Sequence, residues 1–315
     1  MWTYWNPFRL FVQNIPIKYM YVLGKVIGLI AYYLLMNKRY LLDVELKKIL
    51  IGDEESPIFG RTIKDAFIIL CQSELEVLIF PKLNEKNIHH LVDYTGLEYL
   101  DAALSAGKGA MLLFAHFGAN QMIMPAIGYR GYRLSQLSAP ATVWQHIIPG
   151  RNFSKMERFA MEKRWSHELS LPVEHINIFG SLKRAFLCLR QNNVLGVAID
   201  GNWGKERITV DFIKRRANFS VGALELSRRT GCPVLPTFIL RNADGRNHMI
   251  IEAPIEISGF EGDQVITQSI RSFVGRLEHY VVNYPSHYLN FMALRSRMEK
   301  VGDMPLFTQV GDDKL

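Results

Sequence analysis

Short apolar runs alternate with longer amphipathic stretches along most of this 315-residue chain. Five runs have the length and the apolar, β-branched content of buried strands, at residues 110–116, 133–139, 194–200, 233–240 and 248–257. Apolar residues recur at helical spacing in residues 61–83, 119–129, 152–165, 180–192, 220–231 and 265–284. Strands that alternate with helices predict an α/β fold, which we expect to be a mixed, largely parallel sheet flanked by helices.

The N-terminal forty residues have a different pattern. From Tyr19 to Met36 the chain is apolar except for Lys25 and two glycines, a length near the lower limit for a membrane span. Aromatic and basic residues typical of the lipid headgroup zone precede this run: Trp2, Trp5, Phe8, Arg9, Phe11 and Lys18. We expect a helix that lies in or dips into the cytoplasmic leaflet; a full span and an ordinary core helix are the alternatives. The Gly24-x-x-x-Gly28 spacing is weak evidence for helix pairing.

The segments so defined predict a simple domain organisation. We expect residues 1–45 to form an N-terminal membrane-associating helical segment and residues 46–300 to form one α/β domain. Strand–helix connections are short after residue 50, so no inter-domain linker is evident there. Residues 301–315 lack periodicity, which is typical of a flexible tail.

The composition and charge narrow the choice of partner. Hydrophobic residues make up 49% of the chain, too many for a disordered protein, and the formal net charge is +7. A basic chain favours nucleic acid or an anionic membrane surface. Its basic residues occur in small groups, without a dense stripe interleaved with aromatic residues, so we expect a membrane surface and no nucleic acid.

Missing motifs exclude several common activities. Gly-x-Ser-x-Gly, Gly-x-Gly-x-x-Gly and His-Glu-x-x-His are all absent, and "SAGKGA" lacks the rest of a phosphate loop. The three cysteines (Cys71, Cys188 and Cys232) are far apart within apolar stretches, which indicates reduced core residues and neither a disulfide framework nor a zinc site. We expect no metal and no bound cofactor.

His116 is the first candidate for chemistry because it directly follows the apolar run at residues 110–115. In α/β folds, ligands gather at the carboxyl ends of strands. Gly118 lets the backbone bend, and a helix expected near Ala119 would point free N–H groups at a developing anion. An imidazole beside such donors suits acyl transfer, with backbone amides of Phe117 to Ala119 as oxyanion donors. The alternative is a turn histidine bonded to backbone.

Several ordered blocks resemble the bacterial lipid A biosynthesis (lauroyl/myristoyl) acyltransferases, a lysophospholipid-acyltransferase-like family. They are "GLEYLDAALSAGKGAMLLFAHFGAN", "VLGVAIDGNWG", "VDFIKRRANFSVGALELSRRTGCPVLPTFILR" and "YPSHYLNFMALRSR". The resemblance spans roughly residues 20 to 297 and implies a glycerolipid-acyltransferase-like fold with an N-terminal membrane helix. It also implies a histidine/carboxylate dyad, an acyl-carrier-protein or coenzyme A thioester donor, and a lipid or glycolipid hydroxyl as acceptor.

The chain departs from this pattern at Gln121, where the family has its carboxylate. A carboxylate would fix the imidazole tautomer and stabilise the imidazolium, whereas glutamine offers an uncharged oxygen. Three outcomes are open: Gln121 suffices as a weak orienter of His116; another carboxylate such as Asp200 or Glu225 replaces it; or the protein binds lipid without turnover. The family's tryptophan before the acid is also absent, since Asn120 stands there. We expect Asn120 to be a substrate-binding residue of an acceptor pocket that differs from that of the lipid A enzymes.

The resemblance implies further substrate-binding residues. Arg164 best matches a family arginine that would bind phosphate or carboxylate, and Lys214 and Arg215 would hold the donor's phosphopantetheine or an anionic headgroup. Asp200 ends a predicted strand and would face the edge of the sheet at which His116 lies. We expect a membrane-associated O-acyltransferase at the cytoplasmic face of a bacterial inner membrane; a silent lipid-binding relative and a thioester or lipid hydrolase are the alternatives.

Overall fold

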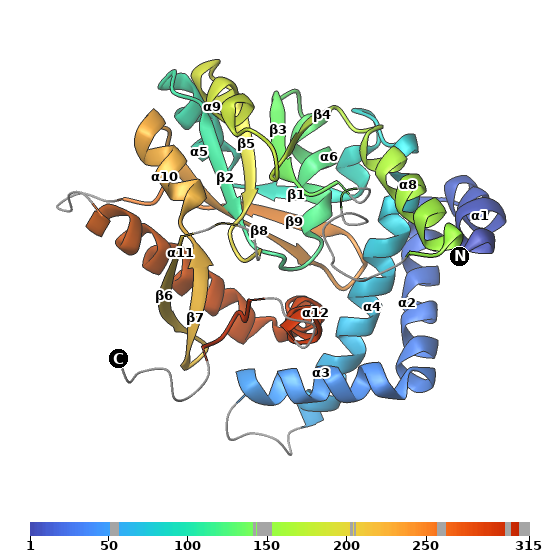
Figure 1. Ribbon diagram of the computed structural model, residues 1–315. Coiled ribbons are helices and arrows are strands. Elements are labelled where there is room, and N and C mark those ends of the chain that lie inside the picture. Colours follow the sequence, from blue (N-terminus) through green and yellow to red (C-terminus); the bar gives the residue numbers. More distant parts are fainter. Residues whose placement is uncertain are drawn as a thin grey trace.

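The computed structural model describes residues 1–50, 57–140, 143, 153–201, 204, 206–256, 263–299 and 304–308. At its centre is a seven-stranded sheet with helices on both faces (Figure 1). The strands of this sheet are β1 (Val92–Thr95), β2 (Ala110–Phe114), β3 (Leu134–Ser138), β4 (Val173–Asn177), β5 (Val194–Ala198), β8 (Val234–Arg241) and β9 (Asn247–Ile251). Their order is β1-β9-β8-β2-β5-β3-β4.

The sheet is mixed and largely parallel, as predicted. Strands β8, β2, β5, β3 and β4 run parallel, whereas β9 is antiparallel to β8 and β1 is parallel to β9. All five residues of the central strand β2 are buried, because helices cover both faces of a parallel sheet. Its side chains alternate between two cores, with Met111 and Leu113 in one and Leu112 and Phe114 in the other.

The sequence pattern missed the two edge strands and one hairpin. Both β1 and β4 are short and only partly buried, so they lack a continuous apolar run. The hairpin of β6 (Arg207–Phe212) and β7 (Arg215–Ser220) turns through two residues, Ile213 and Lys214, both at positive φ. Asn-Gly is the usual signal for such a turn, and an Ile-Lys pair gives no such signal.

The helices occupy most of the predicted stretches. They are α1 (Arg9–Asn14), α2 (Ile17–Leu34), α3 (Met36–Ile49), α4 (Pro57–Ile79), α5 (Leu97–Ser105), α6 (Ile123–Gly128), α8 (Lys155–Glu168), α9 (Lys183–Arg190), α10 (Gly222–Thr230), α11 (Asp263–Asn283) and α12 (Leu289–Glu299). Within the described ranges, a π-helical turn (Tyr4–Phe8) and four 3-10 turns (Phe80–Lys82, Ile88–His90, Asn120–Met122 and Pro285–His287) accompany them. The predicted helix at 152–165 begins at a residue outside the described ranges.

Helix α2 packs against α4 through its two glycines. A Cβ on Gly24 would lie 2.7 Å from the Gln72 side chain, and one on Gly28 would lie 2.6 Å from Ile68 Cα. The Gly-x-x-x-Gly spacing therefore pairs two helices of the same chain, which lie side by side in Figure 1. Such close approach of backbones requires glycine.

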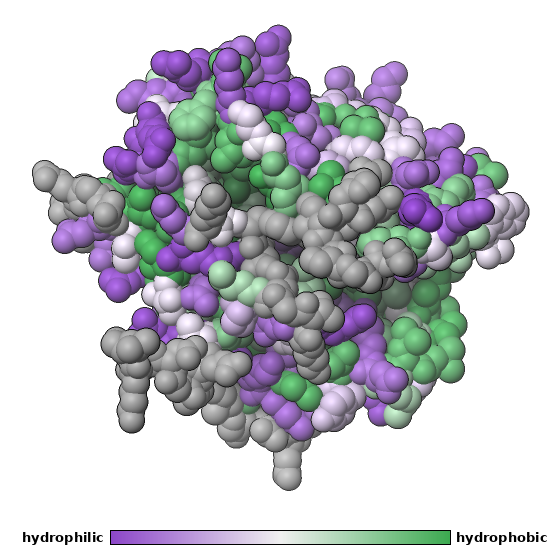
Figure 2. All heavy atoms as spheres, in the orientation of Figure 1, coloured by the Kyte–Doolittle hydropathy of each residue, from purple (hydrophilic) through white to green (hydrophobic). Residues whose placement is uncertain are grey.

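The opposite face of α2 is apolar and exposed. Side chains with 47–72% exposure lie along it and continue to the start of α3: Tyr19, Val22, Val26, Ile30, Tyr33, Leu34, Leu35 and Met36. Figure 2 shows a hydrophobic surface at the right edge of the molecule, where Figure 1 places α2. By length and composition α2 is the one helix of the described ranges that could cross a membrane, and 22% of it is buried.

We expect Gly28→Ala to lower the free energy of unfolding by about 1–3 kcal/mol, because the added methyl group forces α2 away from α4. Gly60→Ala is the matched control, since a Cβ at Gly60 in α4 meets no atom within 4 Å. The control is expected to be neutral or stabilising by up to about 1 kcal/mol. Denaturant titration of both variants in detergent measures the two free energies of unfolding. An equal change in both variants would contradict the prediction.

Part of the predicted C-terminal tail is held against the fold. Leu306 is buried, and its carbonyl accepts a hydrogen bond from Asn218 N–H at 2.8 Å. Thr308 N–H donates to the Arg216 carbonyl at 2.9 Å. Residues 304–308 therefore lie along β7, because Leu306 supplies an apolar side chain to the core; the remaining tail lies outside the described residues. The division of the chain at residues 45 and 300 stays a prediction.

Candidate active site

The register of the parallel sheet brings His116 and Asp200 together. Strands β2 and β5 are paired so that Phe114 lies opposite Ala198. His116 and Asp200 each follow two residues after those positions, where both strands end at the same edge. Two chain segments 84 residues apart thus meet at the carboxyl ends of adjacent strands.

The Asp200 carboxylate takes part in three hydrogen bonds, two with His116 and one with Tyr288. Its Oδ1 lies 2.7 Å from His116 Nδ1, and its Oδ2 accepts from the His116 backbone N–H at 2.8 Å. Tyr288 O–H donates to the same Oδ2 at 3.0 Å. The Asp200 side chain is fully buried, whereas that of His116 is 40% exposed. A buried carboxylate therefore orients a histidine that remains accessible from outside.

Aromatic packing and burial fix the rest of this pair. The His116 ring stacks face to face on Phe291, with centroids 4.5 Å apart. Tyr288 is fully buried, and burial together with the negative charge of Asp200 raises the pKa of its hydroxyl well above the ordinary value. Tyr288 consequently stays protonated and can only donate to Asp200.

A cavity of about 200 Å³ lies in front of the histidine. Within the described residues, His116 Nε2 has no hydrogen-bond partner, and the ring lines this cavity. Other lining residues come from α4, from the loop after β2 and from the start of α12, including Ser73, Glu74, Asn120, Gln121, Asn290 and Leu294. A hydroxyl that enters the cavity can therefore reach Nε2.

Gln121 does not orient His116 in the structure. Its Oε1 accepts a hydrogen bond from Arg164 at 2.9 Å, and the Nδ1 of His116 is already bonded to Asp200. The expectation that Gln121 pairs with the histidine is therefore corrected: the buried carboxylate of Asp200, just after β5, occupies that place. Glu225, the other replacement considered, instead pairs with Arg228 and Arg229 on α10.

Arg164 lies beside the cavity but is occupied by carboxylates. It bonds Glu74 at 2.8 Å and lies 3.5 Å from Glu168, in addition to its bond with Gln121. Two acidic partners neutralise the guanidinium, so the geometry does not favour the predicted role in binding phosphate. Arg164 instead fixes Gln121 and Glu74 at the cavity wall.

The loop after β2 forms one wall of the cavity. Gly118 has φ +62°, and a Cβ there would lie 1.9 Å from the Ile239 carbonyl oxygen, so only glycine fits. Its N–H donates to the His287 carbonyl at 2.9 Å, which removes one of the predicted oxyanion donors. Phe117 and Ala119 are buried, while Asn120 lines the cavity without a side-chain hydrogen bond among the described residues.

The predicted basic pair of the β6–β7 hairpin lies elsewhere. Lys214 is exposed in the two-residue turn at φ +54°. Arg215 stacks on Phe307, 4.0 Å from its ring centroid. Neither residue lines the cavity that contains His116, because the hairpin forms a separate two-stranded sheet.

Sequence reasoning assigned no role to Tyr288, Phe291 and His287. All three lie in the "YPSHYLNF" block, which was noted for its resemblance only. His287 Nε2 accepts from the Arg241 backbone N–H at 2.9 Å, so its ring is neutral. Removal from water, and then the positive charge of Arg241, lowers its pKa to about 3. The aromatic Tyr and Phe of this block were the available signal.

Comparison with known proteins identifies one family. The model of the family described as "bacterial lipid A biosynthesis acyltransferase" matches residues 2–294 of this chain. Two phosphatidylinositol mannoside acyltransferases from Mycobacterium tuberculosis strains CDC 1551 and H37Rv are 30% and 29% identical over 169 residues, 51% of this chain. The chain spans about half, 49%, of the length of these relatives. The solved 1-acyl-sn-glycerophosphate acyltransferase PlsC from Thermotoga maritima is 16% identical, with a TM-score of 0.35, over 84% of this chain and 97% of its own.

Proposed function

Because the chain belongs to the bacterial lipid A biosynthesis acyltransferase family, we propose that it transfers a fatty acyl group from a thioester to a hydroxyl of a lipid or glycolipid. The donor in this proposal is acyl-carrier protein or coenzyme A charged with the acyl chain. The observation that carries the proposal is the His116–Asp200 pair, whose open Nε2 lines a cavity at the edge of the sheet.

The pair supports a single-displacement mechanism. His116 Nε2 takes the proton of the acceptor hydroxyl as its oxygen attacks the thioester carbonyl carbon. Asp200 stays ionised throughout: it accepts a hydrogen bond from Nδ1–H and stabilises the imidazolium. The new C–O ester bond forms, the C–S bond breaks, and the imidazolium returns the proton to the thiolate. The side-chain amide of Asn120, which lines the cavity, would donate to the oxyanion.

We further propose that the enzyme works at the cytoplasmic face of a bacterial inner membrane. The exposed apolar face of α2 would enter the lipid while the glycine face stays packed on α4. The net charge of +7 adds attraction to an anionic leaflet. Recovery of the full chain in the soluble fraction without detergent would count against this placement.

Product analysis tests the proposed reaction. Purified protein in detergent is mixed with a total bacterial lipid extract and a donor, either acyl-carrier protein or coenzyme A, that carries a radiolabelled acyl chain. Wild type is compared with His116→Ala. Labelled lipid ester is expected from wild type and not from the variant. Free fatty acid as sole product would identify a hydrolase, and lipid binding with no product a silent relative. Transfer that survives His116→Ala would refute the mechanism.

A further inference from the structure

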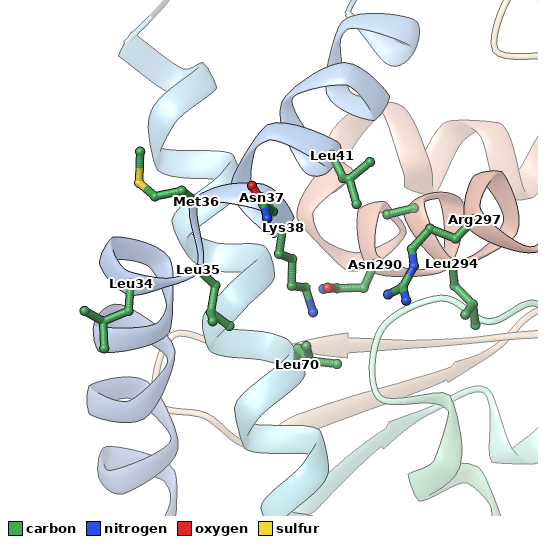
Figure 3. Close-up of a pocket in the computed structure, with 11 residues that line it drawn as sticks. Leu34, Leu35, Met36, Asn37, Lys38, Leu41, Leu70, Asn290, Leu294 and Arg297 are labelled. Carbon is green, nitrogen blue, oxygen red and sulfur yellow. The ribbon is translucent and has the colours of Figure 1, made fainter. Parts of the chain in front are cut away.

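A second cavity, of about 690 Å³, lies where α2 meets α3. It adjoins the cavity that contains His116. Its walls come from the end of α2, the start of α3, the middle of α4 and the helix α12 (Figure 3). The two cavities share Leu70, Asn290 and Leu294 as lining residues. The two cavities therefore adjoin at these three side chains, and together they are called the path from the corner between α2 and α3 to the imidazole.

Two cations face this cavity. Lys38 and Arg297 extend into it from opposite sides, with Asn290 between them (Figure 3). Among the described residues neither one forms an ion pair, in contrast to Arg164 and Arg241, which bond carboxylates. Lys38 is partly buried over Phe67, and withdrawal from water lowers its pKa; Cys71 and the Glu74 carboxylate act in the opposite direction, and the positive Arg297 adds to the lowering. Two adjacent unpaired cations repel one another, and a bound anion would offset that cost.

The mouth of the cavity is apolar. Leu34, Leu35 and Met36 line it with 50–72% exposure, and they continue the exposed face of α2. A ligand that fits has an apolar part at the surface of α2 and an anionic part at the two cations. This arrangement matches an amphiphile that enters from a membrane.

The joint between the two cavities carries an unused acceptor. Asn290 Nδ2 donates to the Ala66 carbonyl at 2.8 Å, which fixes the orientation of the amide. Its Oδ1 is buried and has no hydrogen-bond partner. A hydroxyl of a ligand that lies between the cations and His116 would satisfy this oxygen.

We infer that Lys38 and Arg297 bind the phosphate group of the lipid acceptor, so that the enzyme selects phosphate-bearing amphiphiles whose free hydroxyl reaches His116. A guanidinium and an ammonium are the donors best suited to phosphate oxygens. The inference rests on the proposed acyl transfer, because it assigns the acceptor to this path. The thioester donor would then have to reach His116 from outside this path.

Equilibrium binding of two matched lipids tests this site without turnover. The probes are 1-oleoyl-lysophosphatidic acid and 1-oleoylglycerol in nonionic detergent, which share the chain and differ by the phosphate. Calorimetric titration is expected to show at least tenfold tighter binding of the phosphate-bearing lipid to wild type. Lys38→Gln and Arg297→Gln are each expected to weaken the binding of the phosphate-bearing lipid about tenfold and to leave the binding of 1-oleoylglycerol unchanged.

The control variant is Lys25→Gln, which removes the same charge from an exposed position on α2 outside the cavity. It is expected to bind both lipids as wild type does. The two cavity variants are also expected to keep or raise the thermal unfolding midpoint, because each removes repulsion between cations. A merely structural role for either residue would lower that midpoint.

Specific outcomes would overturn the inference. Equal binding of the two lipids would do so, as would variants that keep the preference. Inorganic phosphate that binds as tightly as the lipid would identify a free-phosphate site. Loss of coenzyme A binding in the variants, with lipid binding intact, would assign the cations to the donor. Acyl transfer without a preference for phosphate-bearing lipids would refute this inference and support the proposed function. Phosphate-selective binding without acyl transfer would support the binding site and refute the proposed function.

Discussion

Asp200→Asn is expected to lower kcat by about four orders of magnitude while the protein still folds. The asparagine amide can donate to Nδ1, which moves the ring proton to Nε2, the nitrogen that must accept the substrate proton. In the serine proteases the comparable exchange of a buried aspartate costs about this factor. Initial rates of transfer from acyl-coenzyme A, together with the thermal unfolding midpoint, measure the effect.

Gln121→Glu is the matched control for that experiment. It places a carboxylate at the family's position, but Gln121 bonds Arg164 and does not contact the histidine. The rate is therefore expected to stay within a few-fold of wild type. If Gln121→Glu raised kcat strongly and Asp200→Asn left it unchanged, the dyad would have to be reassigned to residue 121.

The sequence predicted the part of this site that lies directly after two strands, which is His116 and Asp200. The runs ending near His116 and Asp200 are continuous and apolar, so both strands and their common edge could be expected, and the family was identified from the blocks around them. Periodicity gives no distances across the fold, however. It could not show that Arg164, 43 residues away, binds the Gln121 oxygen.

The N-terminal helix shows the same limit. Its composition predicts a lipid-facing helix, and its glycines predict a partner helix, but neither identifies α4 as that partner. The cations Lys38 and Arg297 come from opposite ends of the chain, and the polar residues around each are typical of a solvent-exposed position. Only the packing of α3 and α12 on α4 brings them to one cavity.

A buried ion pair holds the cavity wall in place. Arg241 on β8 bonds both carboxylate oxygens of Glu76 on α4, at 2.6 and 2.8 Å, and both side chains are at most 3% exposed. Tyr21 from α2 and Asn247 from β9 donate to the same carboxylate. Because Ser73, Glu74 and Glu76 line the His116 cavity, this network ties α2 and the sheet to the wall of the site.

Glu76→Gln is expected to lower the free energy of unfolding by about 3–5 kcal/mol, because it leaves the Arg241 guanidinium buried without its counter-charge. Arg184→Ala is the control: its pair with Glu174 is exposed, so about 0–1 kcal/mol is expected. Denaturant titration in detergent measures both. The double variant Glu76→Leu with Arg241→Met removes both charges and should recover part of the loss, since Tyr21 O–H and Asn247 Nδ2 still lack their acceptor. A single-variant loss below about 1 kcal/mol would show that water reaches this pair and that packing of α4 alone holds the wall.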